Sequence, residues 1–282
     1  MSKKIKDIFI ENKKILKENN FETYSLDVEV LLMNVTGFSK TELYLNTEYT
    51  LKEEELEKFE NFFNRRLKNE PIAYIIGKCE FMGMEFLLNS HTLIPRPDTE
   101  ILVEKAIEII NKNKFKNVVD IGTGSGAIAI SLVKYCGINI DAVDINEKAL
   151  EMCEKNADLN NIKNIKFIQS DIFSNINNKY DVIVSNPPYI KTKEIDTLGK
   201  NVKDYEPLLA LDGGEDGLMF YEKIIKQADK YLNKGGYLMF EIGHDQAKDI
   251  KQLMENNNFY NITILKDLSG LDRVVFGNII YN

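Results

Sequence analysis

The sequence contains few cysteines and histidines. Its 282 residues include three cysteines and two histidines. Cys79, Cys136 and Cys153 have no metal-ligand spacing and are odd in number, so they indicate neither a zinc site nor a disulfide framework. This usage is typical of a reduced, cytoplasmic protein, and we expect no bound metal.

The sequence also lacks apolar runs long enough to cross a membrane. The run at 127–133 is too short and includes Ser131. The opening segment, MSKKIKDIFIENKKI, has a basic and then helical pattern, without the apolar core and cleavage site of an export signal. We therefore expect a cytoplasmic protein without a membrane partner.

An excess of basic residues is missing as well. The formal net charge is −8 at pH 7 and the isoelectric point is about 5.1. Proteins that bind nucleic acid generally carry a basic face, so this balance argues against nucleic acid as the main partner. His91 and His244 stand outside any partnered motif, and there is no P-loop and no G-x-S-x-G elbow. The sequence thus offers little acid–base machinery.

Residues 1–75 have the pattern of a small helical domain. Apolar residues at helical spacing predict a helix over residues 3–19. The sequences that start at Ser39 and at Thr50 match the capping box, in which a hydroxyl and a carboxylate satisfy the free N–H groups of a helix start. The second box predicts the start of a long amphipathic helix.

The rest of the chain changes from a hairpin pattern to an alternating one. Residues 76–95 contain two short apolar runs around Gly83 and predict a β-hairpin connector. Residues 96–282 begin with a predicted helix and then alternate strands and helices, with strands predicted at 117–122, 139–145, 165–171, 180–186, 236–243 and twice in the tail. The alternation indicates an α/β, Rossmann-like, mostly parallel sheet covered on both faces, with one antiparallel strand.

A glycine-rich loop follows the first predicted strand of this sheet. It comprises Gly122, Thr123, Gly124, Ser125 and Gly126, and glycine lets the backbone turn sharply and approach a ligand closely. Asp144 ends the next strand, where a carboxylate can accept bonds from both ribose hydroxyls. The combination predicts a nucleoside-containing cofactor. The spacing is compatible with S-adenosylmethionine and with NAD.

Three residues after the third predicted strand are candidates for an adenine site. The side chain of Asp171 can accept from the exocyclic amine, and Ile172 and Phe173 can sandwich the ring. Alternatively, Asp171 caps a turn and Phe173 belongs to the core. Asp120, at the end of the first strand, either caps a helix or orients the amino group of the cofactor.

The segment VSNPPYIK closes the fourth strand with a stiff turn, because Pro187 and Pro188 fix two φ angles and remove two N–H groups. The side-chain oxygen of Asn186 and the carbonyl of Pro187 can accept the two hydrogens of a planar –NH2 group. Tyr189 offers a ring to hold that group. Two fixed acceptors orient a poorly nucleophilic nitrogen toward an electrophilic methyl carbon without a strong base. A turn of this kind also occurs as a purely structural feature, but here it follows a strand beside the nucleoside loop.

These residues resemble the class I S-adenosylmethionine-dependent methyltransferases of the amino-methylating branch, which is marked by (N/D)-P-P-(Y/F/W). The chain is most similar to the release factor glutamine methyltransferase family, PrmC/HemK. PRPDTE at 95–100 is similar to a signature of that family, and GLDRVV at 270–275 is similar to its ending. The resemblance implies an enzyme that uses S-adenosylmethionine to methylate the side-chain amide nitrogen (N5) of the glutamine in the Gly-Gly-Gln motif of class 1 peptide chain release factors.

The resemblance also implies roles for individual residues. Cofactor contacts are expected from residues 122–126, Asp144, the residue after Asp171, and Asn186. Relatives often carry an aromatic residue at the position of Ile172, so the packing on adenine falls to Ile172 or to Phe173. Substrate binding is expected from residues 186–189, with Asn186, Pro187 and Tyr189 as the catalytic set. The helical domain would grip the release factor, and we expect a monomer.

Four other readings are kept as alternatives. A glutamine methyltransferase acting on a ribosomal protein would share the same catalytic edge. An adenine amino-methyltransferase acting on DNA or RNA would need base flipping and a basic cleft, against which the acidic balance argues. An NAD-dependent enzyme would fit the glycine loop and leave the N-P-P-Y segment without a role. A binding module without catalysis is also conceivable, and the intact cofactor and amide sites argue against it.

Overall fold

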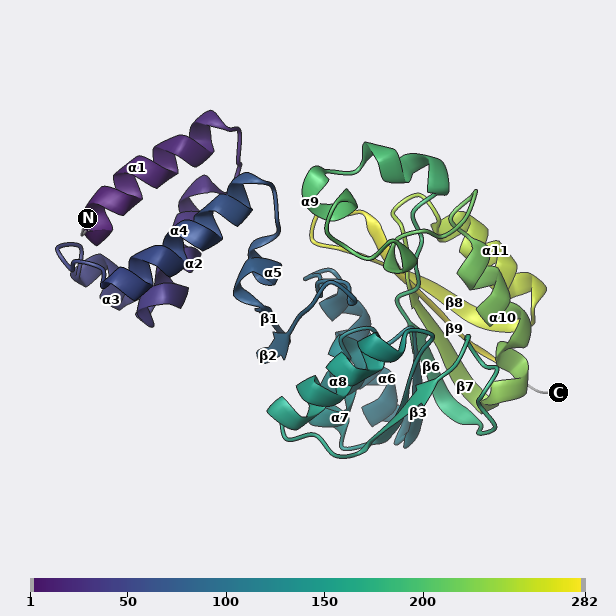
Figure 1. The fold of residues 1–282 in the computed structure, drawn as a ribbon. Coiled ribbons are helices and arrows are strands. Elements are labelled where there is room, and N and C mark those ends of the chain that lie inside the picture. The colour runs from purple at the N-terminus through teal and green to yellow at the C-terminus, as the bar shows by residue number, and fades with distance from the viewer. Residues whose placement is uncertain (1–2, 280–282) are drawn as a thin grey trace. The chain divides into compact units, whose positions relative to one another are not determined.

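The computed structural model describes residues 3–279, and the chain divides into two compact units (Figure 1). The first unit contains residues 3–77 together with Gly199–Tyr205. The second contains Lys78–Leu198 and residues 206–279. The limits expected from the sequence, 1–75, 76–95 and 96–282, place Gly199–Tyr205 in the methyltransferase domain, whereas in the structure this segment packs with the first unit.

The first unit is helical. Its helices are α1 (Ile5–Glu18), α2 (Tyr24–Thr36), α3 (Lys40–Leu45), α4 (Glu53–Leu67), α5 (Ile72–Ile76) and α9 (Lys200–Lys203). The apolar faces of α1, α2 and α4 meet in one core, where Ile8, Leu31 and Phe59 are almost fully buried. Such a core stabilises helices that would be marginal alone.

The two capping boxes predicted in this unit have different outcomes. The box at Ser39 is confirmed, because its hydroxyl accepts from the N–H of Glu42 while the Glu42 carboxylate accepts from the N–H of Ser39. The box at Thr50 is wrong. Thr50 forms an antiparallel β-bridge with Lys4, which keeps it extended, and Lys52 takes the cap position of α4.

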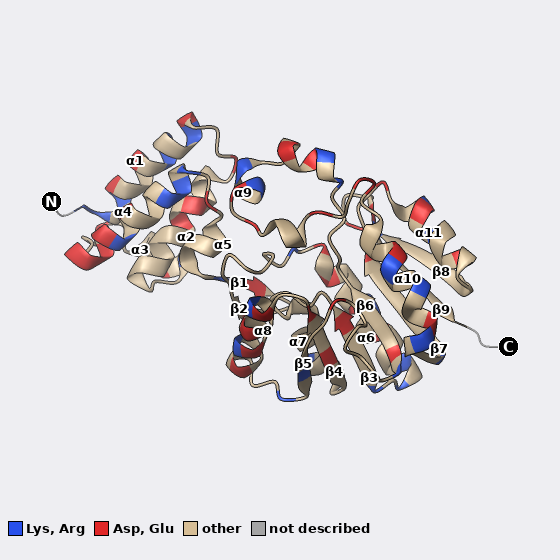
Figure 2. Ribbon diagram, turned by 45° about the vertical axis from the view of Figure 1, so that its right-hand side comes forward, with Lys and Arg blue, Asp and Glu red and all other residues tan. Residues whose placement is uncertain are grey.

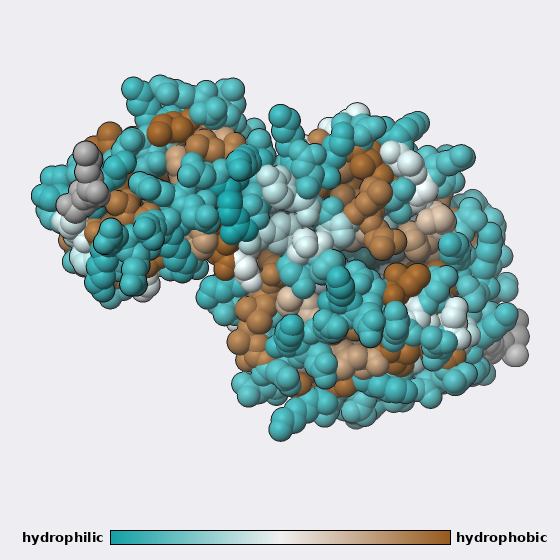
Figure 3. All heavy atoms as spheres, viewed as in Figure 1, coloured by the Kyte–Doolittle hydropathy of each residue, from teal (hydrophilic) through white to brown (hydrophobic). Residues whose placement is uncertain are grey.

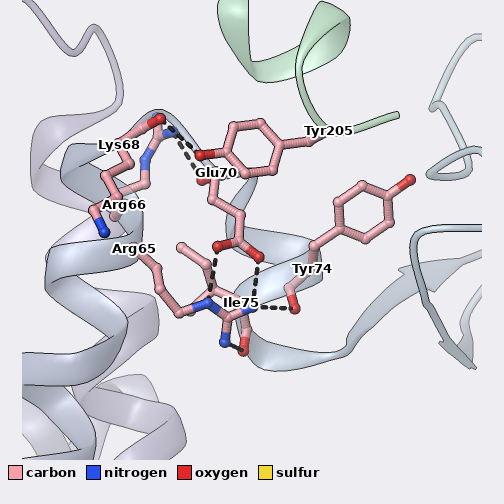
Figure 4. Close-up of polar contacts among 7 residues, drawn as sticks. All are labelled: Arg65, Arg66, Lys68, Glu70, Tyr74, Ile75 and Tyr205. Carbon is pink, nitrogen blue, oxygen red and sulfur yellow. Dashed lines mark hydrogen bonds and ion pairs between the residues drawn. The ribbon is translucent and has the colours of Figure 1, made fainter. Parts of the chain in front are cut away.

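The segment Gly199–Tyr205 is held to the first unit by Tyr205, whose hydroxyl donates to the carbonyl of Lys68 at 2.8 Å (Figure 4). Nearby, the guanidinium of Arg65 donates to the carboxylate of Glu70 and to the carbonyl of Ile75. These bonds fix the short turn between α4 and α5 against which the segment lies.

The second unit begins with the expected hairpin. Strands β1 (Lys78–Phe81) and β2 (Met84–Leu87) pair antiparallel around a tight turn. Both turn residues, Met82 and Gly83, have positive φ angles of 50° and 68°. This is the geometry of a two-residue hairpin loop whose twist matches the flanking strands. Helix α6 (Thr99–Asn113) follows.

The main sheet confirms the α/β prediction. Its strands are β3 (Asn117–Ile121), β4 (Asn139–Asp144), β5 (Ile165–Gln169), β6 (Tyr180–Ser185), β7 (Leu232–Glu241), β8 (Phe259–Lys266) and β9 (Asp272–Ile279). Their order is β5-β4-β3-β6-β7-β9-β8, and only β9 runs antiparallel to its neighbours. From the β3–β6 pair the chain proceeds outward to β4 and β5 on one side and to β7 on the other, and ligands of such sheets bind at this switch point.

Helices cover both faces of the sheet (Figure 1). Helices α6, α7 (Ala127–Cys136) and α8 (Glu147–Leu159) pack on one face, and α10 (Met219–Tyr231) and α11 (Ala247–Asn256) pack on the other. Successive side chains of β6 point to opposite faces of the sheet, so both faces are apolar and need a cover of helices. Val182 and Val184 belong to the first core, whereas Ile183 between them belongs to the second. Two short 3-10 helices, η1 (Thr192–Thr197) and η2 (Leu208–Ala210), follow β6.

The surface is polar and mixed in charge. Figure 2 shows acidic and basic residues interspersed along the helices of each unit, and hydrophilic residues cover most of the face drawn in Figure 3. Within residues 3–279, no helix combines the length and the apolar character that a membrane span requires. The same residues contain no group of three or more His, Cys, Asp or Glu placed to hold a metal ion.

Candidate active site

The carboxyl ends of β3, β4 and β6 border one crevice of the second unit. Its wall contains Gly122, Thr123, Gly124 and Ser125 from the glycine loop, together with Asp144, Asp171, Ile172, Asn186, Pro187 and Pro188. The structure therefore brings most of the residues singled out in the sequence to one place. Gly126, Phe173 and Tyr189 are not part of this wall.

Left-handed backbone and close packing shape the glycine loop. Gly122, Gly124 and Gly126 have φ angles of 74°, 55° and 84°, which side-chain-bearing residues rarely adopt. Gly126 also lies against α8, where a Cβ atom would stand 2.5 Å from the sulfur of Cys153. At Gly122, by contrast, a Cβ atom would meet no atom within 4 Å. Gly126 is thus required for packing, whereas Gly122 borders open space in the crevice.

The carboxylate of Asp144 is fixed by the backbone of neighbouring loops. Its two oxygens accept from the N–H of Gly124 and from the N–H of Asn146, each at 2.9 Å. Burial raises the pKa of Asp144, and these two hydrogen bonds oppose the rise. Each carboxylate oxygen has a further lone pair, so the group can still accept from two hydroxyls in the crevice.

Asp120 lies beneath the loop and is fully buried. Its Oδ2 accepts from the hydroxyl of Thr123 at 2.7 Å, and the backbone N–H of Ala129 in the first turn of α7 acts on this carboxyl to lower its pKa. Burial raises the pKa of Asp120 to about 7. Its Oδ1 is buried without a hydrogen-bond partner among the described residues. These contacts favour the helix-capping reading of Asp120 over a direct cofactor contact.

The adenine candidates are separated by the structure. Asp171 and Ile172 line the crevice, and Ile172 is held at a φ of 51°, an unusual value for a β-branched residue. Phe173 is only 1% exposed and stacks on Tyr231 with 4.3 Å between ring centroids. Because this stacking buries Phe173 in the core beneath α10, we assign the packing against a planar ring to Ile172 and no longer to Phe173.

The N-P-P segment is anchored at the switch point. The hydroxyl of Ser185 donates to the carbonyl of Ile121 at 2.6 Å and ties the end of β6 to the end of β3. Asn186 follows in the crevice wall, and its Nδ2 donates to the hydroxyl oxygen of Thr99 at 3.3 Å. Pro187 is buried and completes this part of the wall.

Tyr189 is placed differently from the expectation of a substrate contact. Its ring packs, partly buried, against the core beneath α10, and its carbonyl accepts from Nε2 of Gln246 at 3.1 Å. Burial raises the pKa of Tyr189 to about 12, so its hydroxyl stays protonated at neutral pH. Tyr189 therefore supports the turn, and its contact with the substrate stays a prediction.

Several residues of the site escaped the sequence-based list. Arg96 and Thr99 line the crevice, and Arg96 forms an ion pair with Glu206, whose side chain is 1% exposed. Arg96 and Thr99 both belong to the PRPDTE motif. That motif supported the family resemblance, but it predicted no role for either residue. Glu241, at the end of β7, is 1% exposed, and burial raises its pKa to about 7 against the lowering effect of the Thr99 and Asn186 side chains. No spacing rule identified Glu241, because it is a single acid within an apolar strand.

Comparisons with known proteins identify the same two regions. Residues 8–77 match the family described as PrmC N-terminal domain, and residues 98–203 match the Methyltransferase small domain. The release factor glutamine methyltransferase of Clostridium acetobutylicum is 42% identical over 277 residues, which is 96% of this chain and 97% of that protein. The enzyme of the same name from Buchnera aphidicola subsp. Schizaphis graminum is 44% identical over 94% of this chain and 96% of its own length.

Solved structures share the fold. A methyltransferase from Pyrococcus furiosus matches with a TM-score of 0.55 at 18% identity and covers 79% of this chain and 100% of that chain. This likeness concerns the fold alone.

Proposed function

This chain belongs to the release factor glutamine methyltransferase family, and from that premise we propose that it methylates the side-chain amide nitrogen of the Gly-Gly-Gln glutamine in class 1 peptide chain release factors. S-Adenosylmethionine would be the methyl donor. The observation that carries the proposal is that the Asn186–Pro188 edge and the loop of residues 122–125 with Asp144 line one crevice. Methyl transfer needs an amide acceptor site and a nucleoside site to meet in this way.

The crevice fits the cofactor. Asp144 offers carboxylate lone pairs to the ribose hydroxyls, and the open space beside Gly122 leaves room for a ligand to approach the backbone. Ile172 supplies an apolar contact for the adenine ring, and the exposed carboxylate of Asp171 supplies an acceptor for its amine. When bound, the cofactor supplies an electrophilic methyl carbon.

The chain's own contribution to the reaction is positioning. The lone pair of an amide nitrogen is delocalised into its carbonyl, so the nitrogen attacks poorly unless it is held. Oδ1 of Asn186 and the carbonyl oxygen of Pro187 would accept the two N–H groups of the glutamine and fix the nitrogen at the crevice wall. As the nitrogen gains its methyl group it becomes acidic and releases a proton to solvent, so no strong base is required.

Tyr189 and the first unit have supporting parts in this proposal. Tyr189 braces the stiff turn from behind through its packed ring and through the bond between its carbonyl and Gln246. The helical first unit would bind the release factor away from the glutamine and add specificity beyond the amide itself.

The test is mass spectrometry of a release factor after incubation with this protein and S-adenosylmethionine. We expect the mass of one methyl group on the peptide that contains the Gly-Gly-Gln motif. A release factor whose motif glutamine is replaced by glutamate should gain none, since a carboxylate has no amide nitrogen. A ribosomal protein and an adenine-containing oligonucleotide serve as competing acceptors. If either of these acceptors were methylated in preference to the release factor, that acceptor and not the release factor would be the substrate.

A further inference from the structure

Two elements far apart in the sequence meet behind Asn186. Thr99 begins α6, and Glu241 ends β7. Both are almost fully buried, at 4% and 1% exposure. Nδ2 of Asn186 donates to the hydroxyl oxygen of Thr99 at 3.3 Å, and the side chains of Thr99 and Asn186 both lower the pKa of the Glu241 carboxyl against the effect of burial. Asn186 and Thr99 are therefore hydrogen-bonded in the crevice wall, and the buried carboxyl of Glu241 lies next to them.

The orientation of Asn186 depends on these two neighbours. A terminal amide can rotate so that its oxygen and its nitrogen exchange places, and the backbone of Asn186 does not choose between the two arrangements. Methylation as proposed requires the oxygen to face the crevice, because the substrate amide brings donors. Burial raises the pKa of Glu241 to about 7, so the carboxylate is ionised above neutral pH and then only accepts hydrogen bonds. In that form it favours the arrangement in which the –NH2 group of Asn186 points inward.

The surrounding charges leave Glu241 available for this task. Arg273 is engaged by Asp267 at 3.0 Å and by Asp98 at 3.4 Å. Burial is the largest influence on the pKa of Glu241 and raises it, whereas the positive charge of Arg273 acts at longer range to lower it and the charge of Asp98 raises it. Oε2 of Glu241 has no hydrogen-bond partner among residues 3–279, although the atom is buried. A buried acid with an unsatisfied oxygen destabilises a fold, so its presence here calls for a role in the site.

We propose that Glu241 and Thr99 are positioning residues, which hold the –NH2 group of Asn186 inward so that its oxygen faces the amide being methylated. Glu241 acts through Asn186 and does not touch the substrate. The inference rests on the proposed function, since only an amide or amine substrate requires an acceptor at this point.

The first test separates positioning from structure by kinetics. Glu241→Gln and Thr99→Val should each lower kcat about 10- to 100-fold while the dissociation constant for S-adenosylmethionine changes less than about twofold. Thr99→Ser keeps the hydroxyl and should stay within about threefold of the unaltered protein. Asp267→Asn makes the same acid-to-amide change on the other side of Arg273, without reaching Asn186, and should also stay within about threefold.

The second test exchanges the acid and the amide. Asn186→Asp alone places a carboxylate against Glu241, so neither group can donate and the activity should be lost. Combining Asn186→Asp with Glu241→Gln restores one donor in the pair, and kcat should rise at least about tenfold above that of Asn186→Asp alone. No gain in the double variant, or an unchanged kcat in both Glu241→Gln and Thr99→Val, would overturn the inference.

A third measurement does not depend on methyl transfer. The side-chain –NH2 protons of Asn186, assigned in NMR spectra by their disappearance in Asn186→Asp, should exchange slowly with water. In Thr99→Val and Glu241→Gln they should exchange at least about tenfold faster, and in Asp267→Asn they should not change. If the proton exchange follows this pattern while no release factor is methylated, the proposed function fails and the positioning inference stands. Rapid exchange in the unaltered protein would refute the positioning inference itself.

Discussion

The two sides of the crevice are built by different means. On the cofactor side, the glycine loop is held mainly by its own backbone and by neighbouring strands, for example through the N–H groups of Gly122 and Thr123, which both donate to the carbonyl of Val143. On the amide side, Asn186 is held by side chains, and Thr99 lies 87 residues away in the sequence. Changes on the first side should therefore alter stability and cofactor affinity, and changes on the second should alter the rate of transfer.

The largest effect is expected for Asn186→Ala. This change removes the acceptor for one amide hydrogen and should lower kcat about a thousandfold, the scale of losing one preorganised polar group. The dissociation constant for S-adenosylmethionine, measured by calorimetry, should change less than about threefold, because Asp144 and the glycine loop are untouched. If cofactor affinity fell as much as kcat, the two sides of the crevice would not be separable in this way.

Gly126→Ala tests the cofactor side. A Cβ atom there would lie 2.5 Å from the sulfur of Cys153 and 2.9 Å from Cδ1 of Ile130, at a φ of 84°. We expect a loss of about 3 kcal/mol in the free energy of unfolding, measured in urea, from the combined clash and left-handed backbone. The affinity for S-adenosylmethionine should fall with it, because relief of the clash displaces the loop.

Gly137→Ala is the matched control at the other end of α7. Gly137 has a φ of 61°, but a Cβ atom there would meet nothing within 4 Å. Gly137→Ala should therefore lower the free energy of unfolding only by the cost of the left-handed backbone, about 1 kcal/mol. Adding Cys153→Ala to Gly126→Ala should recover part of the difference and no more, since Ile130 remains close. Equal losses for Gly126→Ala and Gly137→Ala would show that packing against α8 is not what requires glycine.

The same contrast explains what the sequence could and could not reveal. The strand ends were predictable from short apolar runs that alternate with helical segments along the chain. The carboxyl ends of parallel strands share one edge, so it was also predictable that the glycine loop, Asp144 and Asn186 would lie along the same edge. The local pattern of the loop carried the information, because its contacts are local.

Other features depended on pairings that no local pattern encodes. Phe173 was a candidate for the adenine site, and only its stacking on Tyr231 places it in the core. Glu241 is an acid in an apolar strand, and its significance comes from Thr99 and Asn186 on other elements. The return of Gly199–Tyr205 to the first unit includes a hydrogen bond from the Tyr205 hydroxyl to the carbonyl of Lys68, 137 residues away in the sequence. Each of these is a long-range contact between residues that look ordinary in the sequence.

The smallest expected effect concerns pH, and both sides of the crevice contribute to it. Burial raises the pKa of Asp120 from 3.8 to about 7, and burial raises the pKa of Glu241 from 4.5 to about 7. Between about pH 4.5 and 7, the unfolded chain has lost these protons while the folded chain still holds them. Stability should therefore fall as the pH rises through this window, because the folded state binds more protons than the unfolded state there.

Glu29 in the first unit provides the opposite sign for comparison. Burial acts to raise its pKa, but hydrogen bonds from Tyr44, Lys13 and Lys40 outweigh that effect and lower the pKa to about 2. Its contribution is present above about pH 4.5 and is lost as the pH falls toward 2. In thermal unfolding series from pH 3 to 8, Glu241→Gln should flatten the decline between pH 4.5 and 7, whereas Glu29→Gln should alter only the acid side. Glu29 is hydrogen-bonded by two lysines and lies in the first unit, so it should not affect the decline in stability above pH 5. If Glu29→Gln made that decline less steep, burial of the acids beneath the crevice would not be its source.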